Sequence, residues 1–256
     1  MEFSNRYIVG FAVILCLVSA LGVSSAAVAL KPLQEKNKLL FKQKNVLLAA
    51  GIISEGEAVS PEQVAEYFQE IDELVIERRS GAILDEDPAN IDPIRLAKDP
   101  ETSEATPSEH KGTQIRRLPD KLLVYDVKVD GFEGLVLPIH GNGLWSTLYG
   151  FLALTTDGSM IQGITYYEHG ETPGLGGEVD NPKWKAQWPG KRALDQDGTP
   201  LVVVVKAGLA EDQETEVDGI SGATITSRGV GDMVQLWLGK HGYGPYLAAK
   251  RSTQNE

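Results

Sequence analysis

The chain has 256 residues, enough for one sizeable domain with extensions and a substantial hydrophobic core. Its 36 acidic against 24 basic residues give a formal net charge of -12, which argues against nucleic-acid binding because phosphate neutralisation needs clustered cations. The single cysteine, Cys16, excludes an intrachain disulfide and a Cys-ligated iron–sulfur cluster. The histidines His110, His140, His169 and His241 show no metal-ligand spacing, so the sequence predicts no intrinsic metal site.

The N-terminal segment 7–30 is apolar apart from Ser and Gly, and it is long enough to cross a hydrocarbon core. A cleaved signal peptide is the main alternative, because Ala26–Ala29 resembles a small-residue cleavage site. The preceding residues include Glu2 and Arg6, and the apolar run exceeds a usual signal core. We therefore expect an uncleaved anchor over residues 7–30, preceded by a cytoplasmic N-terminus at residues 1–6.

Basic residues follow the expected anchor, at Lys31, Lys36, Lys38, Lys42 and Lys44. The positive-inside tendency would keep this flank of the helix in the cytoplasm.

Residues 31–112 form the next expected region, a helical segment followed by a polar one. Leucines and valines in 33–50 fit an amphipathic helix, and Ser60 to Gln63 carries an N-cap, a proline and a capping-box Gln. Val64, Phe68, Ile71 and Val75 continue at helical spacing and predict a second helix. From 81 to 112 the chain is polar with four prolines, which predicts a long irregular surface segment.

Strand patterns begin at Leu122 and define an expected domain over residues 113–256. Apolar and polar residues alternate up to Val129, and Asp157-Gly158 marks a hairpin. The apolar run Leu201–Val205 predicts a central strand covered on both faces. Further strands are expected at Gly134–Ile139, Leu148–Thr155, Met160–Tyr167 and Leu201–Ala207. The fold class is α+β, with a mostly antiparallel sheet and flanking helices behind one transmembrane helix.

The most informative stretch is Asp218-Gly219-Ile220-Ser221-Gly222-Ala223-Thr224. Helical spacing of apolar residues begins just beyond it, at Val230, Met233, Val234 and Trp237. A helix N-terminus offers unpaired N–H groups and partial positive charge, so Thr224 is placed to carry or contact a phosphate. The alternative is an ordinary turn with a Ser or Thr cap.

This stretch resembles the flavinylation motif of proteins that carry FMN covalently. A second segment runs from Glu168 to Glu178 as EHGETPGLGGE and continues through Asn181-Pro182-Lys183-Trp184 to Trp188-Pro189-Gly190-Lys191. Together with the N-terminal anchor, these segments resemble the C subunit of the sodium-translocating NADH:quinone reductases over essentially the whole chain. The resemblance implies that a flavin transferase esterifies the FMN phosphate to Thr224.

The resemblance also implies further FMN-binding residues. Asp218, Ser221, Gly222 and Ala223 match the rest of the motif and would serve transferase recognition and backbone clearance. Thr226 and Ser227 would cap the helix, bind phosphate oxygens, or both. The ring or ribityl contacts carried over from the family are Glu171, Thr172, Leu175 and Gly176.

Two other residues, Trp145 and Lys206, each have two open interpretations. Trp145, with Ser146 beside it, is either a core tryptophan or a neighbour of the isoalloxazine ring. Lys206 is either a strand-end lysine in solvent or a positive charge near the pyrimidine edge of the flavin. Trp184 and Trp188 are expected to brace the domain or a subunit contact rather than touch the flavin.

The implied function is that of an electron-relay subunit, in a membrane complex that oxidises NADH, reduces ubiquinone and pumps Na⁺. No Gly-x-Gly-x-x-Gly run lies between a strand and a helix, so a nicotinamide site within this chain is unsupported. The resemblance implies a single-pass protein of the bacterial inner membrane with its soluble domain on the periplasmic side, against the charge pattern. Two alternatives are the G subunit of the related ferredoxin:NAD⁺ electron-transport complex and a membrane-tethered binding domain without a cofactor.

Overall fold

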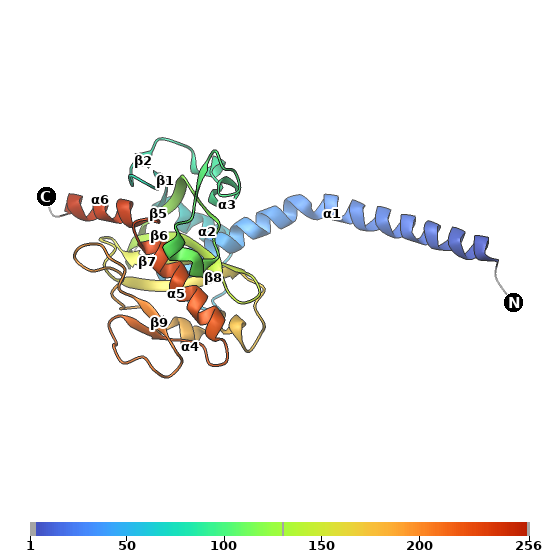
Figure 1. The fold of residues 1–256 in the computed structure, drawn as a ribbon. Helices are drawn as coiled ribbons and strands as arrows, with labels where there is room; N and C mark the ends of the chain where they lie inside the picture. Colours follow the sequence, from blue (N-terminus) through green and yellow to red (C-terminus); the bar gives the residue numbers. More distant parts are fainter. Residues whose placement is uncertain (1–3, 130, 255–256) are drawn as a thin grey trace. The chain divides into compact units, whose positions relative to one another are not determined.

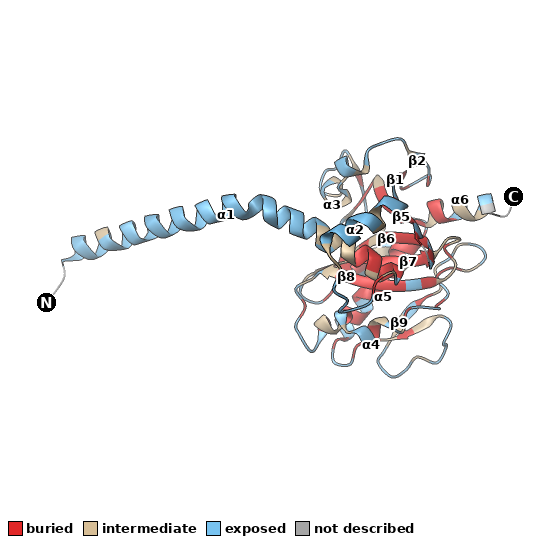
Figure 2. Ribbon diagram, turned by 180° about the vertical axis from the view of Figure 1, so that it is seen from behind, coloured by how far each residue is buried: buried red, intermediate tan, exposed pale blue. Residues whose placement is uncertain are grey.

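The computed structural model describes residues 4–129 and 131–254, and it divides into two compact units between Lys42 and Gln43. Helix α1 (Asn5–Ala50) runs without interruption across this division and past Pro32. The anchor expected at 7–30 and the helix expected at 33–50 are therefore parts of one helix. An 18-residue window of α1 has a mean hydropathy of 2.4 and contains no buried residue (Figure 2), so α1 is long and apolar enough to cross a membrane.

The second unit, Gln43–Glu256, is built on a six-stranded antiparallel sheet (Figure 1). The strand order is β2-β1-β5-β6-β7-β8. The expected hairpin joins β7 to β8, and Gly158 adopts the positive φ of 71° that its turn requires. The strands are β1 (Ile71–Glu77), β2 (Ile83–Leu84), β5 (Lys121–Val129), β6 (Phe132–Asn142), β7 (Thr147–Thr155) and β8 (Ile161–Glu168). The mostly antiparallel α+β fold is confirmed.

The second predicted helix is too long. Helix α2 (Pro61–Tyr67) has the predicted capping box, in which Ser60 and Gln63 bond each other's backbone N–H groups. After a 3-10 turn, η1 (Phe68–Glu70), the chain enters β1, which pairs along its length with β5. Ladder bonds to β5 and burial of Ile71, Val75 and Ile76 override the local helical spacing.

The predicted central strand at Leu201–Ala207 is also wrong. Only β9 (Val203–Val205) forms, and it pairs in parallel with β10 (Glu216–Asp218) in a separate two-stranded sheet. Val203 is 37% exposed, so the apolar run lies at the surface on one side. An apolar run of this length fits either a central strand or a short strand beside a helix, and here α5 covers it.

Helix α5 (Thr224–Leu238) covers one face of the main sheet and packs on β6 (Figure 1). Its predicted apolar face is confirmed, because Val230, Met233, Val234 and Trp237 are all buried in the main core. Ile164 and Tyr166 of β8 join that core, whereas Gly163 and Thr165 point to the opposite face. There the last turns of α1 cover them: the Thr165 hydroxyl donates to the carbonyl of Asn45 at 3.0 Å.

Residues 81–112 follow an irregular path, as predicted, and the buried cation Arg78 at the end of β1 holds Glu104 within this segment. The Arg78 side chain is only 2% exposed and donates to the carbonyl of Pro119 at 2.8 Å and to Glu104 at 2.9 Å. The short elements here are η2 (Pro88–Asn90), α3 (Pro93–Leu96), β3 (Ser103–Ala105), η3 (Ser108–Thr113) and β4 (Arg117–Pro119). The remaining elements are η4 (Gly176–Asp180), α4 (Pro182–Lys185) and α6 (Gly244–Gln254).

Candidate functional site

A cleft opens where α5 begins, between the turn that joins β6 to β7 and the loop after β8. It encloses about 560 Å³, open solvent at its mouth included, which lies in the usual range of small-molecule sites. The lining residues are Leu144, Trp145, Glu171, Thr172, Leu175, Gly176, Gly222, Ala223, Thr224, Ile225 and Thr226. The cleft thus gathers residues from both segments that the sequence singled out.

Thr224 is the first residue of α5, and its side chain is exposed. The preceding N-cap residue, Ala223, has no side chain able to accept from the first-turn N–H groups. Gly222 has a φ of 77°, a left-handed conformation that glycine adopts without strain. The turn therefore presents a hydroxyl beside an uncapped helix N-terminus, an arrangement that favours a phosphate group.

A second hollow lies on the other side of Thr224 and carries positive charge. Lys206, Ser221, Gly222, Thr224 and Arg228 are among its lining residues. Lys206 and Arg228 are both exposed; Lys206 directly follows β9, and Arg228 lies in the second turn of α5. In a chain with a net charge of -12, two cations beside an uncapped helix start make a local region of positive potential.

The carboxylate of Glu171 is buried at the inner wall of the cleft, where hydrogen bonds hold it. It accepts from the backbone N–H groups of Leu144, Trp145 and Ser146 at 3.2, 2.8 and 2.9 Å, and from the hydroxyl of Thr226 at 2.8 Å. Burial opposes ionisation and raises the pKa of Glu171, but the bonds from Trp145, Thr226, Ser146 and Leu144 outweigh it and leave the pKa below its ordinary value. Glu171 is therefore an anion that shapes the cleft.

Two glycines make room for this carboxylate. A Cβ on Gly176 would lie 2.4 Å from Glu171 Oε2 and 2.7 Å from Thr226 Oγ1. A Cβ on Gly143 would lie 2.7 Å from Glu171 Cδ. Gly176, predicted as a flavin contact, thus also has a structural reason to lack a side chain.

The outer walls of the cleft are apolar and open to solvent. Leu144, Trp145, Leu175 and Ile225 are 48%, 72%, 47% and 53% exposed. This exposure excludes the interpretation of Trp145 as a core tryptophan. Large apolar side chains gathered around one cleft mark a place where an apolar ligand surface would be covered. Leu144 and Ile225 were missed, although each stands next to a predicted residue.

Several predicted residues have partners inside the protein. The Ser146 hydroxyl lies 2.7 Å from the N–H of Gly170, and Ser227 accepts from Ile220 and donates to the carbonyl of Ala223. Thr226 donates to Glu171, so the hydroxyls of Thr226 and Ser227 both have other partners than the first-turn N–H groups of α5. The Asp218 carboxylate accepts from the N–H groups of Leu209 and Ala210, so it holds the loop after β9.

Trp184 and Trp188 are not among the residues that line the cleft. Both are buried, their rings meet edge to face at 5.7 Å, and Trp184 donates to the carbonyl of Asp218 at 2.7 Å. Trp184 thus braces the loop that leads into the Thr224 turn, and both rings are part of the hydrophobic core.

Comparisons with known proteins identify the same region. A family model described as an FMN-binding domain matches residues 143–239, which include the whole cleft. The C subunit of the Na⁺-translocating NADH-quinone reductase of Pseudomonas aeruginosa is 46% identical, and the match covers 94% of each chain. The C subunit of the Vibrio vulnificus enzyme is 45% identical over 97% of this chain and 96% of that protein.

Solved structures agree with this similarity. The crystal structure of Shewanella oneidensis NqrC superposes with a TM-score of 0.73 at 32% identity, covering 82% of this chain and 96% of that one. The C subunit of the Parabacteroides distasonis enzyme superposes with a TM-score of 0.66 at 27% identity, covering 85% and 96%. The sequence similarity extends over nearly the full length and the fold agrees over most of it, and the chain belongs to the family formed by the C subunits of the Na⁺-translocating NADH-quinone reductases.

Proposed function

We propose that this chain carries FMN through a phosphoester on Thr224 and acts as an electron relay in a Na⁺-translocating NADH:quinone reductase. The observation that carries the proposal is the exposed Thr224 hydroxyl at the uncapped start of α5, inside a cleft with apolar walls. Family membership supports it, because the relatives named above are subunits of that enzyme and the FMN-binding model covers the cleft.

The residues around Thr224 fit a phosphate. Uncapped N–H groups of the first turn and the positive end of the helix dipole face the position of the hydroxyl. Lys206 and Arg228 line the adjoining hollow and offset the negative charge of a phosphodiester. A phosphoester at this place prevents the flavin from leaving during turnover.

The opposite wall of the cleft fits the flat ring of a flavin. Leu144, Trp145, Leu175 and Ile225 offer apolar cover, and the exposed Thr172 hydroxyl offers a hydrogen bond to a polar ring edge. FMN, when bound, supplies the capacity to accept and pass on one or two electrons. The chain's own residues orient it and exclude water from one face.

The chain is a membrane-anchored single-pass protein, and the other redox groups of the relay come from other subunits. We place the flavin domain on the periplasmic side of the bacterial inner membrane, where the flavin transferase acts on Thr224. This placement follows the family and opposes the lysine-rich flank of the anchor. The G subunit of the ferredoxin:NAD⁺ complex is disfavoured, because the relatives named above are all C subunits of the NADH-quinone reductase.

Co-expression with the flavin transferase tests attachment. The full chain is denatured, viewed under ultraviolet light on a gel and digested for mass spectrometry. We expect fluorescence that survives denaturation and a Thr224 peptide heavier by FMN less one water. Thr224→Val should abolish both signals while the protein stays folded, and Thr224→Ser should retain some attachment because the hydroxyl chemistry survives.

Thr172→Val is the matched control, because it removes a second exposed hydroxyl of the same cleft. It should keep the covalent flavin on Thr224. Covalent flavin on Thr224→Val would show that another residue carries it. A wild-type chain with unmodified mass and no colour would favour a membrane-tethered binding domain without a cofactor.

A further inference from the structure

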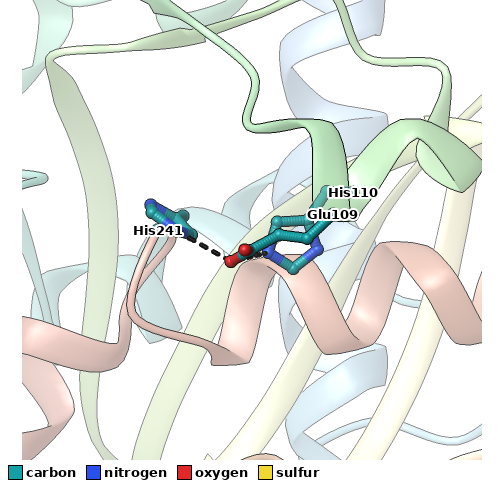
Figure 3. A group of neighbouring side chains, drawn as sticks. All are labelled: Glu109, His110 and His241. Carbon is teal, nitrogen blue, oxygen red and sulfur yellow. Dashed lines mark hydrogen bonds and ion pairs between the residues drawn. The ribbon is translucent and has the colours of Figure 1, made fainter.

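Outside the cleft, three side chains able to ligate a metal converge at the edge of the polar segment 81–112 (Figure 3). Glu109 and His110 belong to η3, and His241 lies in the turn between α5 and α6. One ligand atom from each lies within 4.8 Å of the others. No spacing in the sequence indicates this group, because the fold alone brings His241 next to η3.

The distances approach those of a bound transition-metal ion. Nε2 of His241 lies 3.1 Å from Glu109 Oε1, and Nε2 of His110 lies 3.7 Å from the same oxygen. Metal–ligand bonds of about 2.0–2.2 Å in tetrahedral geometry put neighbouring ligand atoms about 3.3–3.6 Å apart. Small side-chain rotations of Glu109 and His241, whose side chains are 54% and 28% exposed, would complete that geometry.

Buried groups fix the backbone beneath both imidazoles. The guanidinium of Arg78, itself 2% exposed, donates to the carbonyl of His241 at 3.2 Å. The hydroxyl of Thr113, a fully buried residue, donates to the carbonyl of His110 at 2.8 Å. Because these bonds hold the main chain, each imidazole starts from a restricted position, and less conformational entropy is lost when a ligand binds.

The Glu109 carboxylate already attracts cations. The ammonium group of Lys240 lies 3.3 Å from Glu109 Oε1, on the oxygen that His241 contacts. The Lys240 side chain is 75% exposed, so it can turn into solvent when a stronger cation arrives. An ion of charge two bound to two neutral imidazoles and one carboxylate replaces this weak exposed pair.

We propose that Glu109, His110 and His241 bind one divalent transition-metal ion of the zinc type, with a fourth position open to water or to a group from another subunit. Two His and one Glu are the protein ligands of known zinc sites that keep such a position open. Imidazole ligands favour zinc-type ions over Mg²⁺ and Ca²⁺, which take oxygen ligands. The bound ion ties η3 to the α5–α6 turn, independently of the flavin cleft.

Zinc titration of the full chain in detergent tests this proposal. The protein is stripped with a chelator, dialysed and titrated with Zn²⁺ against a chromophoric indicator, and its melting temperature is followed in parallel. We expect one tightly bound Zn²⁺ per chain, a raised melting temperature and no effect of Mg²⁺ at the same concentration. His241→Gln and His110→Gln should each weaken binding by more than about tenfold.

His169→Gln is the matched control, since His169 pairs with a single carboxylate, Asp180, at 2.8 Å. It should bind Zn²⁺ as the wild type does. His241→Gln leaves the backbone carbonyl that Arg78 holds, so its folding can be checked from the unchanged melting temperature of the metal-free protein. Equal zinc affinity of wild type and the double variant His110→Gln/His241→Gln, or no stoichiometric binding at all, would overturn the proposal.

Discussion

The Thr226 hydroxyl donates a 2.8 Å hydrogen bond to the Glu171 carboxylate, across 55 positions in the chain. The same carboxylate holds the N–H groups of Leu144, Trp145 and Ser146. One buried anion therefore sets the start of α5 against the turn that carries Trp145. The two walls of the cleft keep their spacing through Glu171, whether or not it ever contacts a ligand.

Replacing Glu171 by Gln should destabilise the domain. The amide nitrogen of Gln is a donor and would face a ring of donors, so at least one buried bond is lost at a cost of about 1–3 kcal/mol. Urea denaturation of the full chain measures the change in the free energy of unfolding. The exposed Glu133 offers a control, and Glu133→Gln should lie within about 0.5 kcal/mol of the wild type.

The same variant should change how stability depends on pH. The folded pKa of Glu171 is below its ordinary value of 4.5, so the carboxylate stabilises the fold above that pH. This contribution disappears as the pH falls through the folded pKa. Glu171→Gln should therefore differ most from the wild type near neutral pH and least in acid, and a constant difference across pH would contradict this origin.

Gly176→Ala should disturb the cleft at its inner wall. The added methyl would lie 2.4 Å from Glu171 Oε2, so the carboxylate or the loop must move, at a cost of about 1–3 kcal/mol. Gly170→Ala is the matched control, because its Cβ would meet Ser146 Cβ at an ordinary 3.4 Å. Thermal unfolding of both variants distinguishes them, and equal melting temperatures would show that the Glu171 pocket is not tightly packed.

Trp145→Ala should leave stability nearly unchanged and alter the environment of the flavin. The side chain is 72% exposed, so its removal should change the free energy of unfolding by less than about 0.5 kcal/mol. The absorption and fluorescence of the attached flavin should nevertheless change, because the ring loses apolar cover. Ile83→Ala, at 60% exposure on β2, should leave both spectra as they are. A flavin spectrum unaffected by Trp145→Ala would remove that residue from the site.

The ring of His140 should make the fold sensitive to mild acid. It lies 4.8 Å from the ring of Trp237 and 5.9 Å from that of Tyr149, and burial lowers its pKa from 6.5 to about 4. Between these values the unfolded chain binds the additional proton, so stability falls as the pH is lowered from 6.5 towards 4, by at most about 3 kcal/mol.

His140→Phe keeps an aromatic ring between Tyr149 and Trp237 and removes the titration. Urea midpoints at pH 7 and pH 5 should therefore differ less in the variant than in the wild type. If both proteins lost the same stability over this interval, the acid sensitivity would come from other groups.

The sequence was sufficient wherever a local pattern had one physical solution. The hairpin at Gly158 and the apolar face of α5 are examples, because period and turn chemistry act over a few residues. The spacing of Ile71 and Val75 led to the wrong prediction of a helix. A spacing of four also places two residues on one face of a strand, and the pairing partner of that strand, β5, lies far along the chain. The apolar run Val203–Val205 led to the wrong prediction of a central strand, because the sequence does not reveal which strand will pair with it.

The candidate site also has features that the sequence could predict and features that it could not. Thr224 and the glycine-rich loop could be singled out from motifs, and the fold brings them to one cleft. The role of Glu171 could not be foreseen, because its partners come from two distant turns. Nor could the approach of His110 to His241, which depends on the course of the polar segment across the end of α5.

Quinone reduction by the complex assembled with Thr224→Val tests the central claim most directly. NADH oxidation, quinone reduction and covalent flavin on this subunit are measured together for the wild type, Thr224→Val and Thr224→Ser. We predict that the Thr224→Val complex assembles and retains NADH oxidation with an artificial acceptor, but has lost quinone reduction, with Thr224→Ser active in proportion to its attached flavin. Full quinone reduction by a complex lacking flavin on this subunit would contradict the account.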